Sequence, residues 1–413
     1  MPVPVHRFFL PILSLLLALA PVLAGPAIAA PHLVVDMKTG KVLAKQEAFD
    51  RWYPASLTKL MTAYTVFREV RKGTVTMRSP VLVTANALSK PPSKMGFPLG
   101  SVLTVDNALK ILMVKSANDV AVAVAESVGG SEKAFVELMN GYAREIGMDA
   151  SRFVNPHGLH DAGQYTTAHD MAVLTMALRK EFATHDSYFD IPAIQVGGRS
   201  IANHNQLLFR FRGTTGMKTG FVCASGLNVI VTAKRGPREL IAVVLGGPTG
   251  QERNVRAAKL LNDGFLKNTF LVKDKLETMR PSGFVKTAGT DMRNIVCKPR
   301  SKQVKKDAIR SNLMAFAGDE AEGEGGAGLP SLDELEQKLL GPKVRKLPAS
   351  GVIRVALGDA TGPDPYGLMV ESERLTEIRK KAEAAAAAKA AAKKKARAAA
   401  KKKKSSKKKS AKK

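Results

Sequence analysis

A serine and a lysine three residues apart form the first pair in this chain that could do chemistry. Ser56 and Lys59 lie in the stretch PASLTK, where Pro54 opens a run of apolar residues at helical spacing. Residues three apart share one helix face, so the lysine amine can approach the serine hydroxyl. A lysine with a pKa lowered by burial or nearby positive charge can take the serine proton and make the oxygen nucleophilic. Taken alone the pair is weak evidence, because a lysine-rich chain contains such spacings by chance.

A second polar motif, KSAND, follows about 60 residues later. It places Ser116 and Asn118 in a short connection between two predicted helices, the first of which can be capped by Thr104. Both side chains could point from this connection into one cleft. A serine and an asparagine in such a place more often cap helices, so the motif alone leaves both interpretations open.

The tetrapeptide MKTG occurs twice, at residues 37–40 and 217–220. The first copy lies in a polar, glycine-containing segment between two short apolar runs, which predicts a hairpin turn. The second lies in a segment with strand periodicity, about a hundred residues after KSAND. There Lys218 could supply positive charge, Thr219 a hydroxyl for a substrate carboxylate, and Gly220 room for a ligand backbone along the strand.

The order of the three motifs is more specific than any one of them. Ser-x-x-Lys, Ser-x-Asn and Lys-Thr-Gly, in this order, are associated with class A β-lactamases and penicillin-binding proteins. The chain resembles the low-molecular-mass penicillin-binding proteins, the serine D-alanyl-D-alanine carboxypeptidases, over roughly residues 32–268. The segments that carry this resemblance are YPASLTKLMTAY, SANDVAVAVAESVGG, FVNPHGL, NHNQLL and GMKTGF. Only the second MKTG follows the nucleophile, so only that copy is expected in the site.

The resemblance implies a mechanism and the residues that perform it. Ser56 would attack the carbonyl between the two terminal D-alanines of a peptidoglycan stem peptide, with Lys59 as general base. Ser116 and Asn118 would relay protons and hold the substrate, and Lys218 would tune the electric field. Substrate-binding residues would be Thr219, Gly220, Phe221 and His204, with the backbone N–H groups of Ser56 and Phe221 forming the oxyanion hole. β-Lactam antibiotics would bind at the same serine, and no cofactor or metal would be needed.

Two departures from the family pattern are visible in the sequence. Some members carry an arginine where NHNQLL has His204, so a histidine grip on the carboxylate would depend on pH; a histidine that fixes a turn is an equal alternative. Many relatives continue into a β-rich second domain and an amphipathic membrane helix, which residues 269–413 do not match.

Residues 1–29 predict a secretory signal, with a short basic start, an apolar run from Phe8 to Ala20 and an A-x-A site near its end. A membrane anchor is the alternative, but prolines leave the apolar run short for a bilayer. We therefore expect an exported protein of the periplasm or cell envelope. The chain has two cysteines, Cys223 and Cys297, and we expect them not to pair, because the second lies in a stretch with little sign of folding.

The spacing of apolar residues predicts an α/β fold of the α+β type, and the family resemblance implies that this is the β-lactamase and transpeptidase fold. Strand patterns at both ends of residues 31–268, with helices between them, predict an antiparallel sheet flanked by helices with an inserted helical subdomain. Residues 269–370 predict a poorly defined linker region, and residues 371–413 an Ala/Lys-rich tail that is helical or disordered.

The net charge of +28 is concentrated at the C-terminal end. From Arg379 to Lys413 there are 17 Lys or Arg and one Glu, so this segment contributes +16. Such a low-complexity block predicts a solvated arm that binds polyanions. In an exported protein, an anionic envelope surface is the expected partner, and nucleic acid is not expected.

Four other functions were weighed against the carboxypeptidase. A class A β-lactamase uses a glutamate after the Ser-x-Asn motif, and FVNPHGLHDAGQYTT has none. An endopeptidase that cuts peptide cross-links would use the same residues and stays open. A metallopeptidase with His157, His160 and Asp161 as zinc ligands lacks the usual helical spacing. A non-catalytic wall-binding protein would not require the nucleophile.

Overall fold

The computed structural model describes residues 30–298, 302–317, 331–342 and 351–410. The predicted signal segment, residues 1–29, lies outside them. The central element is a five-stranded antiparallel sheet with strand order β2-β1-β9-β8-β7. Its strands are β1 His32–Asp36, β2 Val42–Gln46, β7 Thr214–Val222, β8 Gly226–Arg235 and β9 Arg238–Gly247. Because β1 pairs with β9, the first and last strands of the predicted domain close one sheet, as the sequence predicted.

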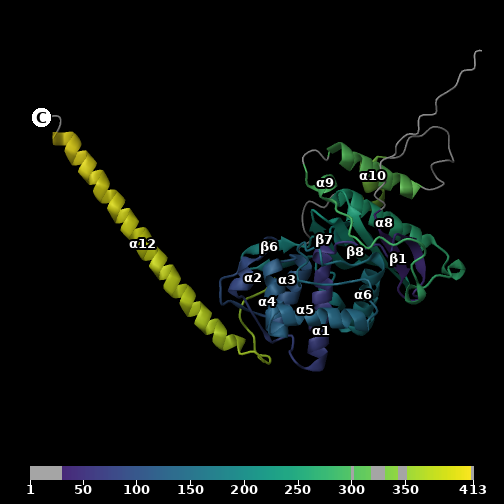
Figure 1. Ribbon diagram of the computed structural model, residues 1–413, viewed down its shortest axis with the longest axis horizontal. Coiled ribbons are helices and arrows are strands. Elements are labelled where there is room, and N and C mark those ends of the chain that lie inside the picture. The colour runs from purple at the N-terminus through teal and green to yellow at the C-terminus, as the bar shows by residue number, and fades with distance from the viewer. Residues whose placement is uncertain (1–29, 299–301, 318–330, 343–350, 411–413) are drawn as a thin grey trace, which may run out of the picture.

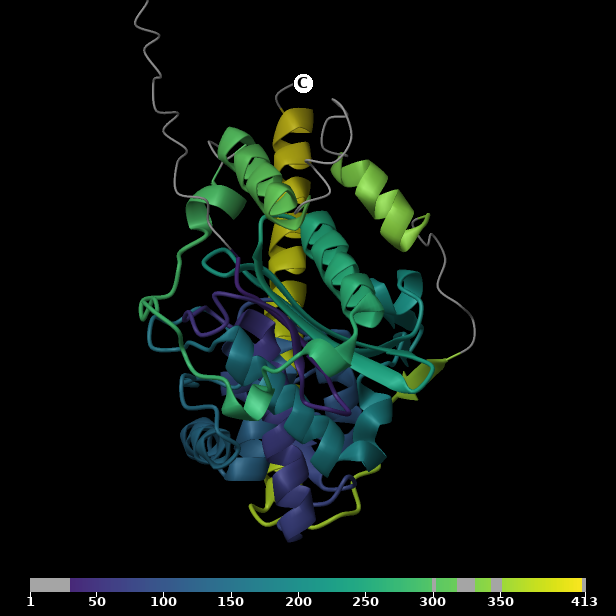
Figure 2. The same cartoon turned by 90° about the vertical axis from the view of Figure 1, so that its right-hand side faces the viewer.

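Both faces of this sheet are buried, and strand β9 shows how. Its residues alternate between two apolar cores: Ile241, Val243 and Leu245 enter one, and Leu240, Ala242 and Val244 enter the other. Successive side chains of a strand point to opposite faces, so a strand covered on both sides is apolar throughout. Helix α8, Gly250–Leu266, covers the second face, and α6, Ala168–Glu181, contacts the first (Figure 2).

A helical subdomain is inserted between β2 and β7, as predicted. Its main helices are α1 Thr58–Lys72, α2 Ala85–Ser89, α3 Val105–Val114, α4 Asn118–Gly129 and α5 Glu132–Glu145, with the small hairpin β3 Pro80–Leu82 and β4 Val102–Thr104 beside them. The predicted cap is confirmed, because Thr104 accepts a hydrogen bond from the backbone at the start of α3, and Ser131 caps α5 in the same way. The left-handed conformation of Gly130 ends α4.

The remaining elements complete the domain and the chain that follows it. They are η1 Ala55–Leu57, η2 Ala183–Tyr188, β5 Ala193–Val196, β6 Arg199–Ala202, α7 Leu207–Arg210, η3 Thr269–Leu271, η4 Leu276–Thr278, α9 Arg293–Val296, α10 Lys302–Ala317, α11 Leu332–Leu340, β10 Val352–Val355 and α12 Leu368–Ser410. Among the described residues, no helix combines the length and apolar character needed to cross a membrane.

The expectation that the two cysteines stay unpaired was wrong, because Cys223 and Cys297 form a disulfide. The stretch around the second cysteine is folded against the domain. Met292 and Ile295 are buried in the main core, and the Met292 N–H donates to the carbonyl of Ala224. This docking brings α9 and the cysteine after it to the end of β7.

The region expected as a linker contains segments that return to the domain. Strand β10 pairs in parallel with β5, and α11 packs on α8. A buried ion pair joins Arg210 to Glu336 of α11. Of the two forms expected for the tail, the structure has the helix, α12, which leaves the domain as a long arm (Figure 1).

Candidate active site

Ser56 and Lys59 face each other at the start of helix α1. Ser56 lies in the short helix η1, and the Nζ atom of Lys59 is 3.2 Å from its Oγ. Lys59 is fully buried and also donates to Oδ1 of Asn118 at 2.8 Å and to the carbonyl oxygen of His157 at 2.6 Å. These two acceptors have no proton to give, so both hydrogen bonds must use Lys59 hydrogens.

Three partners surround this amine. A charged lysine satisfies them by donating to all three, and a neutral lysine satisfies them by donating to Asn118 and His157 and accepting the Ser56 hydroxyl on its lone pair. Burial first, and the positive charge of Lys218 second, hold the pKa of Lys59 well below its usual range, while Asp119 opposes them. The amine is therefore placed and tuned to take a proton from Ser56 without a movement of heavy atoms.

The backbone around Ser56 is fixed by close packing. Gly158 lies so near that a Cβ on it would be 1.8 Å from the carbonyl oxygen of Ala55, and its φ of +87° also favours glycine. On the other side, a Cβ on Gly220 would be 3.0 Å from the Ser56 nitrogen. The Nδ2 of Asn228 donates to the carbonyl of Pro54. These contacts hold η1 between the His157–Gly158 loop and strand β7.

A second lysine and serine face each other across the cleft. The Nζ of Lys218 on β7 donates to Ser116 Oγ at 2.9 Å and to the Thr219 carbonyl at 2.9 Å. Ser116 lies between α3 and α4 with a positive φ of 59°. Burial, helped by the charge of Arg253, lowers the pKa of Lys218 to about 7. Lys218 therefore carries a positive charge for part of the time near neutral pH and acts on Lys59 through space.

A cavity of about 500 Å³ opens over these groups. Half of the residues that line it were predicted from the sequence as site residues: Ser56, Ser116, Asn118, Thr219, Gly220, Phe221 and His204. Lys59 and Lys218 lie beneath the cavity, where they make hydrogen bonds to Ser56, Ser116 and Asn118 of its lining. The structure thus brings the three motifs together, whereas the first MKTG forms the turn between β1 and β2.

The sequence analysis missed Arg253, which also lines the cavity. It lies in the first turns of α8, is 7% exposed, and its guanidinium donates to Asn254 Oδ1. Burial lowers its pKa to about 10, so it stays charged at neutral pH. Nothing in ERNVRAAK marks this arginine as different from the other charged residues of the segment. Only the packing of α8 on the sheet turns it toward the cleft.

His204 lines the same cavity, at its open side. Partial burial at the cleft and then the positive charges of Lys218 and Lys115 lower its pKa to about 4. It is therefore neutral at pH 7. On both sides the backbone is held by asparagines, since Asn203 and Asn205 donate to the carbonyls of Ile191 and Gly216. The turn is thus fixed by these amides and leaves the histidine ring free to face the cavity.

The groups of the metallopeptidase alternative are engaged elsewhere. The Nδ1 of His157 accepts from the Leu159 N–H, and the ring of His160 packs edge-on against Tyr53. Asp161 accepts from the N–H of Gly163. Within the ranges that the structure describes, no group of three or more His, Cys, Asp or Glu side chains is arranged to hold a metal.

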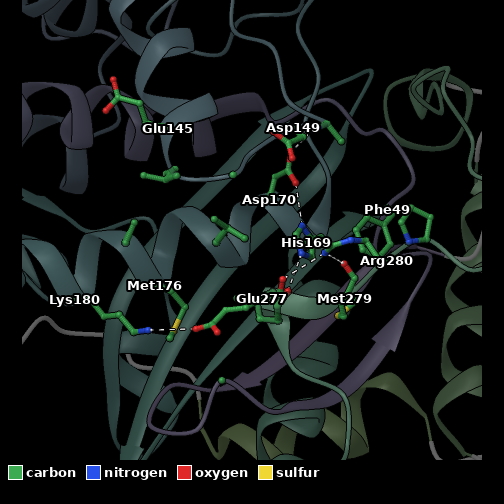
Figure 3. Close-up of a pocket in the computed structure, with 18 of the residues that line it drawn as sticks. Phe49, Glu145, Asp149, His169, Asp170, Met176, Lys180, Glu277, Met279 and Arg280 are labelled. Atoms are coloured by element: carbon green, nitrogen blue, oxygen red, sulfur yellow. Dashed lines mark hydrogen bonds and ion pairs between the residues drawn. The ribbon is translucent and has the colours of Figure 1, made fainter.

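A second hollow, of about 810 Å³, lies between α6 and the segment around Glu277. Within it, Lys180 approaches Glu277, and the ring of His169 contacts Asp170 and the carbonyl of Leu276 (Figure 3). Of the motif residues it contains only Gly40, from the first MKTG, and none from PASLTK, KSAND or the second MKTG, so the 500 Å³ cavity is the candidate active site.

Comparison with known proteins decides the family. A family model described as D-alanyl-D-alanine carboxypeptidase matches residues 22–249, more than half of the chain. The chain belongs to this family. The DacA D-alanyl-D-alanine carboxypeptidase of Escherichia coli K12 is 34% identical over 241 residues, which are 57% of this chain and 60% of that protein. Membership in a family of serine peptidases disfavours the metallopeptidase and the non-catalytic alternatives.

Solved structures confirm the predicted fold class. Penicillin-binding protein 5 of Haemophilus influenzae matches with a TM-score of 0.55 and 32% identity, over 59% of this chain and 72% of that one. Penicillin-binding protein D2 of Listeria monocytogenes, solved in its ampicillin-bound form, matches with a TM-score of 0.50 and 26% identity, over 57% of this chain and 96% of that one. The chain spans about 60% of the length of the curated relative above, and its C-terminal extension lies outside the family match.

Proposed function

We propose that this protein is a serine D-alanyl-D-alanine carboxypeptidase that removes the terminal D-alanine from peptidoglycan stem pentapeptides. The observation that carries the proposal is the environment of the Lys59 amine. It is buried, its pKa is depressed, its N–H groups are occupied by Asn118 and His157, and Ser56 Oγ lies 3.2 Å away. An uncharged amine facing a serine is the arrangement that general-base activation of a nucleophile requires.

Acylation begins when Ser56 Oγ attacks the carbonyl carbon of the penultimate D-alanine and its proton passes to Lys59. The backbone N–H groups of Ser56 and Phe221 face the developing oxyanion and stabilise it. The C–N bond then breaks, and the leaving D-alanine nitrogen takes up a proton relayed through Ser116. Water hydrolyses the ester on Ser56, with Lys59 again accepting the proton. The products are free D-alanine and a shortened stem peptide.

The terminal carboxylate selects this substrate. Arg253 provides a fixed positive charge at the cavity wall, and Thr219 provides a hydroxyl on β7. His204, neutral at pH 7, contributes a hydrogen bond rather than a charge. Arginine at this wall thus replaces the cationic grip that some relatives place at the position of His204.

The two MKTG copies supply a matched test of carboxylate binding. Thr219→Ala removes the proposed contact, whereas Thr39→Ala removes a threonine whose N–H and hydroxyl bond Asp36 within the β1–β2 turn. We expect kcat/KM for the pentapeptide to fall about tenfold in Thr219→Ala, the loss of one hydrogen bond to a charged group, and to stay unchanged in Thr39→Ala. Equal effects of both substitutions would contradict the assignment.

The primary experiment is D-alanine release from a stem pentapeptide by the full chain and by Ser56→Ala. Abolished release in the variant, together with penicillin labelling of the wild type alone, is the expected result. The relative solved with ampicillin bound supports labelling at this cavity. If the wild type is labelled but releases no D-alanine, the reaction is instead endopeptidic, on cross-linked dimers. Absence of both release and labelling would refute the proposal.

We further propose that the protein is exported and that its lysine-rich arm binds an anionic envelope surface. The pattern of residues 1–29 and the disulfide both suit an oxidising compartment outside the cytoplasm. The charge of +16 from Arg379 onward suits a polyanion. Binding of the full chain to isolated envelopes should fall steeply between low and high salt, and a variant without residues 384–413 should not bind. Salt-independent binding by that variant would contradict this assignment.

A further inference from the structure

Helix α12 does not begin as a free arm, because one face of its first turns lies on the active-site domain. The hydroxyl of Ser372 donates to the carbonyl of Gly100 at 2.6 Å, and Arg379 donates to the carbonyl of Leu99 at 3.0 Å. Between them, Thr376 packs so closely that a Cβ on Gly100 would be 2.8 Å from its hydroxyl. Positions 372, 376 and 379 share one helix face. This face is only partly exposed, and the rest of the helix projects away from the domain (Figure 1).

The start of α12 is placed by a strap, residues 356–367, that crosses the helical subdomain. Asn107 donates to the carbonyl of Ala356, the Gly358 N–H donates to Val102, and the backbone N–H of Thr361 donates to Arg78. The Asp364 carboxylate then accepts the backbone N–H groups of Leu368 and Met369, which begins the helix. These hydrogen bonds hold the strap on the helical subdomain at several points and so place the start of α12.

The loop that receives α12 reaches the catalytic cavity at its other end. Residues 90–100 connect α2 to the hairpin, and Pro92 and Ser93 line the cavity. The Ser93 carbonyl accepts the Asn118 N–H at 2.6 Å, and the Pro91 carbonyl accepts from Asn118 Nδ2 at 3.0 Å. The same Asn118 holds Lys59 through its Oδ1. One loop therefore joins the docked face of α12 to the amide that orients the proposed base.

We propose that the docked face of α12, through Ser372, Thr376 and Arg379, is a positioning element that fixes the 90–100 loop and, through it, Asn118 and the wall of the catalytic cavity. The proposal rests on the function proposed above. Along residues 90–98 the loop has no strand or helix of its own, and its other side-chain anchors include the Asp119 carboxylate, which accepts the N–H groups of Met95 and Gly96, and the bond from Ser93 Oγ to the Lys115 carbonyl. Loops with few internal bonds open at low free-energy cost unless neighbouring elements hold them. Displacement of a catalytic group by a fraction of an ångström is enough to slow a reaction.

The test compares two arginines on the same helix in the full chain. Arg379→Ala removes the bond to Leu99, whereas Arg374→Ala removes an arginine that pairs with Glu371 on the exposed side of α12. The two variants lose the same charge, so any effect of charge on the arm is shared. Arg379→Lys keeps one donor for the Leu99 carbonyl and should restore much of the wild-type behaviour. Ser372→Ala combined with Arg379→Ala should enlarge the effect.

Two readouts separate positioning from simple stability. Hydrogen exchange of a peptide spanning residues 92–101 should speed up in Arg379→Ala and not in Arg374→Ala. For D-alanine release we expect kcat to fall about fivefold with KM nearly unchanged, well within the hundredfold that a 1 Å misplacement can cost. The melting temperatures of the two variants should agree.

The possible outcomes are distinct. Unchanged exchange and unchanged kcat in Arg379→Ala, in an active wild type, would overturn the proposal. Equal changes in both arginine variants would also overturn it, since the cause would then be charge or helix stability. An inactive wild type would instead refute the function proposed above, and the exchange comparison would still decide whether α12 holds the loop.

Discussion

In the catalytic cleft, Lys59 and Lys218 are almost completely enclosed, and their bonds to Asn118, His157 and Ser116 reach distant parts of the chain. On the outer part of α12, charged side chains such as Lys381 are exposed and pair with a neighbour one turn away. Burial makes a lysine sensitive to its surroundings, because removing the charged group from water shifts its pKa. Solvent screens each exposed charge of α12, so these side chains act only through the summed field of many charges. Lysine is therefore a group with a shifted pKa in the catalytic cleft and one of many similar surface charges on the outer part of α12.

The largest expected effect comes from Lys218→Gln, which removes a charge from the cleft. The Lys218 cation lowers the pKa of Lys59, so its removal should raise that pKa. The acid limb of kcat/KM against pH should then move to higher pH, because Lys59 must be neutral to act as base. Loss of the Ser116 contact as well should reduce kcat about a hundredfold, as seen when one polar contact of a transition state is removed. A lower kcat with an unmoved acid limb would show that Lys218 does not tune Lys59.

Buried histidines predict a second pH effect, this time on stability. Burial, with the charges of Lys59 and Lys90, lowers the pKa of His157 to about 3. The unfolded chain takes up this proton near pH 6.5, so stability from this group is complete above that pH and falls as the pH drops toward 3. At pH 4 the loss is about 3 kcal/mol from His157. Urea unfolding at pH 7 and pH 4 should show a smaller difference in His157→Gln, and an equal difference would exclude this histidine as the cause.

The C-terminal extension also has buried charges, at the place where α11 meets the domain. Arg210 and Glu336 are buried together, and Gln251 donates to the same carboxylate at 2.7 Å. Arg210→Ala should cost about 3 kcal/mol of unfolding free energy, since it leaves a carboxylate buried without its cation. The double variant Arg210→Ala/Glu336→Ala should cost less than the single one, measured by urea unfolding. If the double variant is as unstable as the single one, packing and not charge holds α11.

The sequence was most informative where function and structure depend on nearby residues. Ser56 and Lys59 share one helix turn, and the cap at Thr104 is a local pattern, so all three were predicted. The cysteine pair and Arg253 were not, because they depend on how α9 and α8 dock on the sheet, far away in the sequence.

The C-terminal extension also makes contacts that could not be predicted from the sequence. Its composition predicted an exposed basic tail, whereas helix α11 lies in the region that was expected to be a poorly defined linker. Its contacts with the domain could not be predicted. Strand β10 is four residues long and joins β5 across more than 150 residues, and the bonds from α12 go to the backbone carbonyls of Leu99 and Gly100. Backbone acceptors carry no sequence signature, so this kind of docking is visible only in three dimensions.

The smallest effect is expected for Lys381, on the exposed part of α12. Lys381 pairs with Glu377 at 3.3 Å one turn away, and both side chains are mostly exposed. Lys381→Ala should change the unfolding free energy by less than about 0.5 kcal/mol, because an i,i+4 surface pair contributes little and alanine favours the helix. Kinetics of D-alanine release should be unchanged, since Lys381 contacts neither the 90–100 loop nor the cavity in any hydrogen bond that the described residues make. A marked loss of activity in this variant would mean that charge on the arm reaches the cleft by a route other than the docked face of α12.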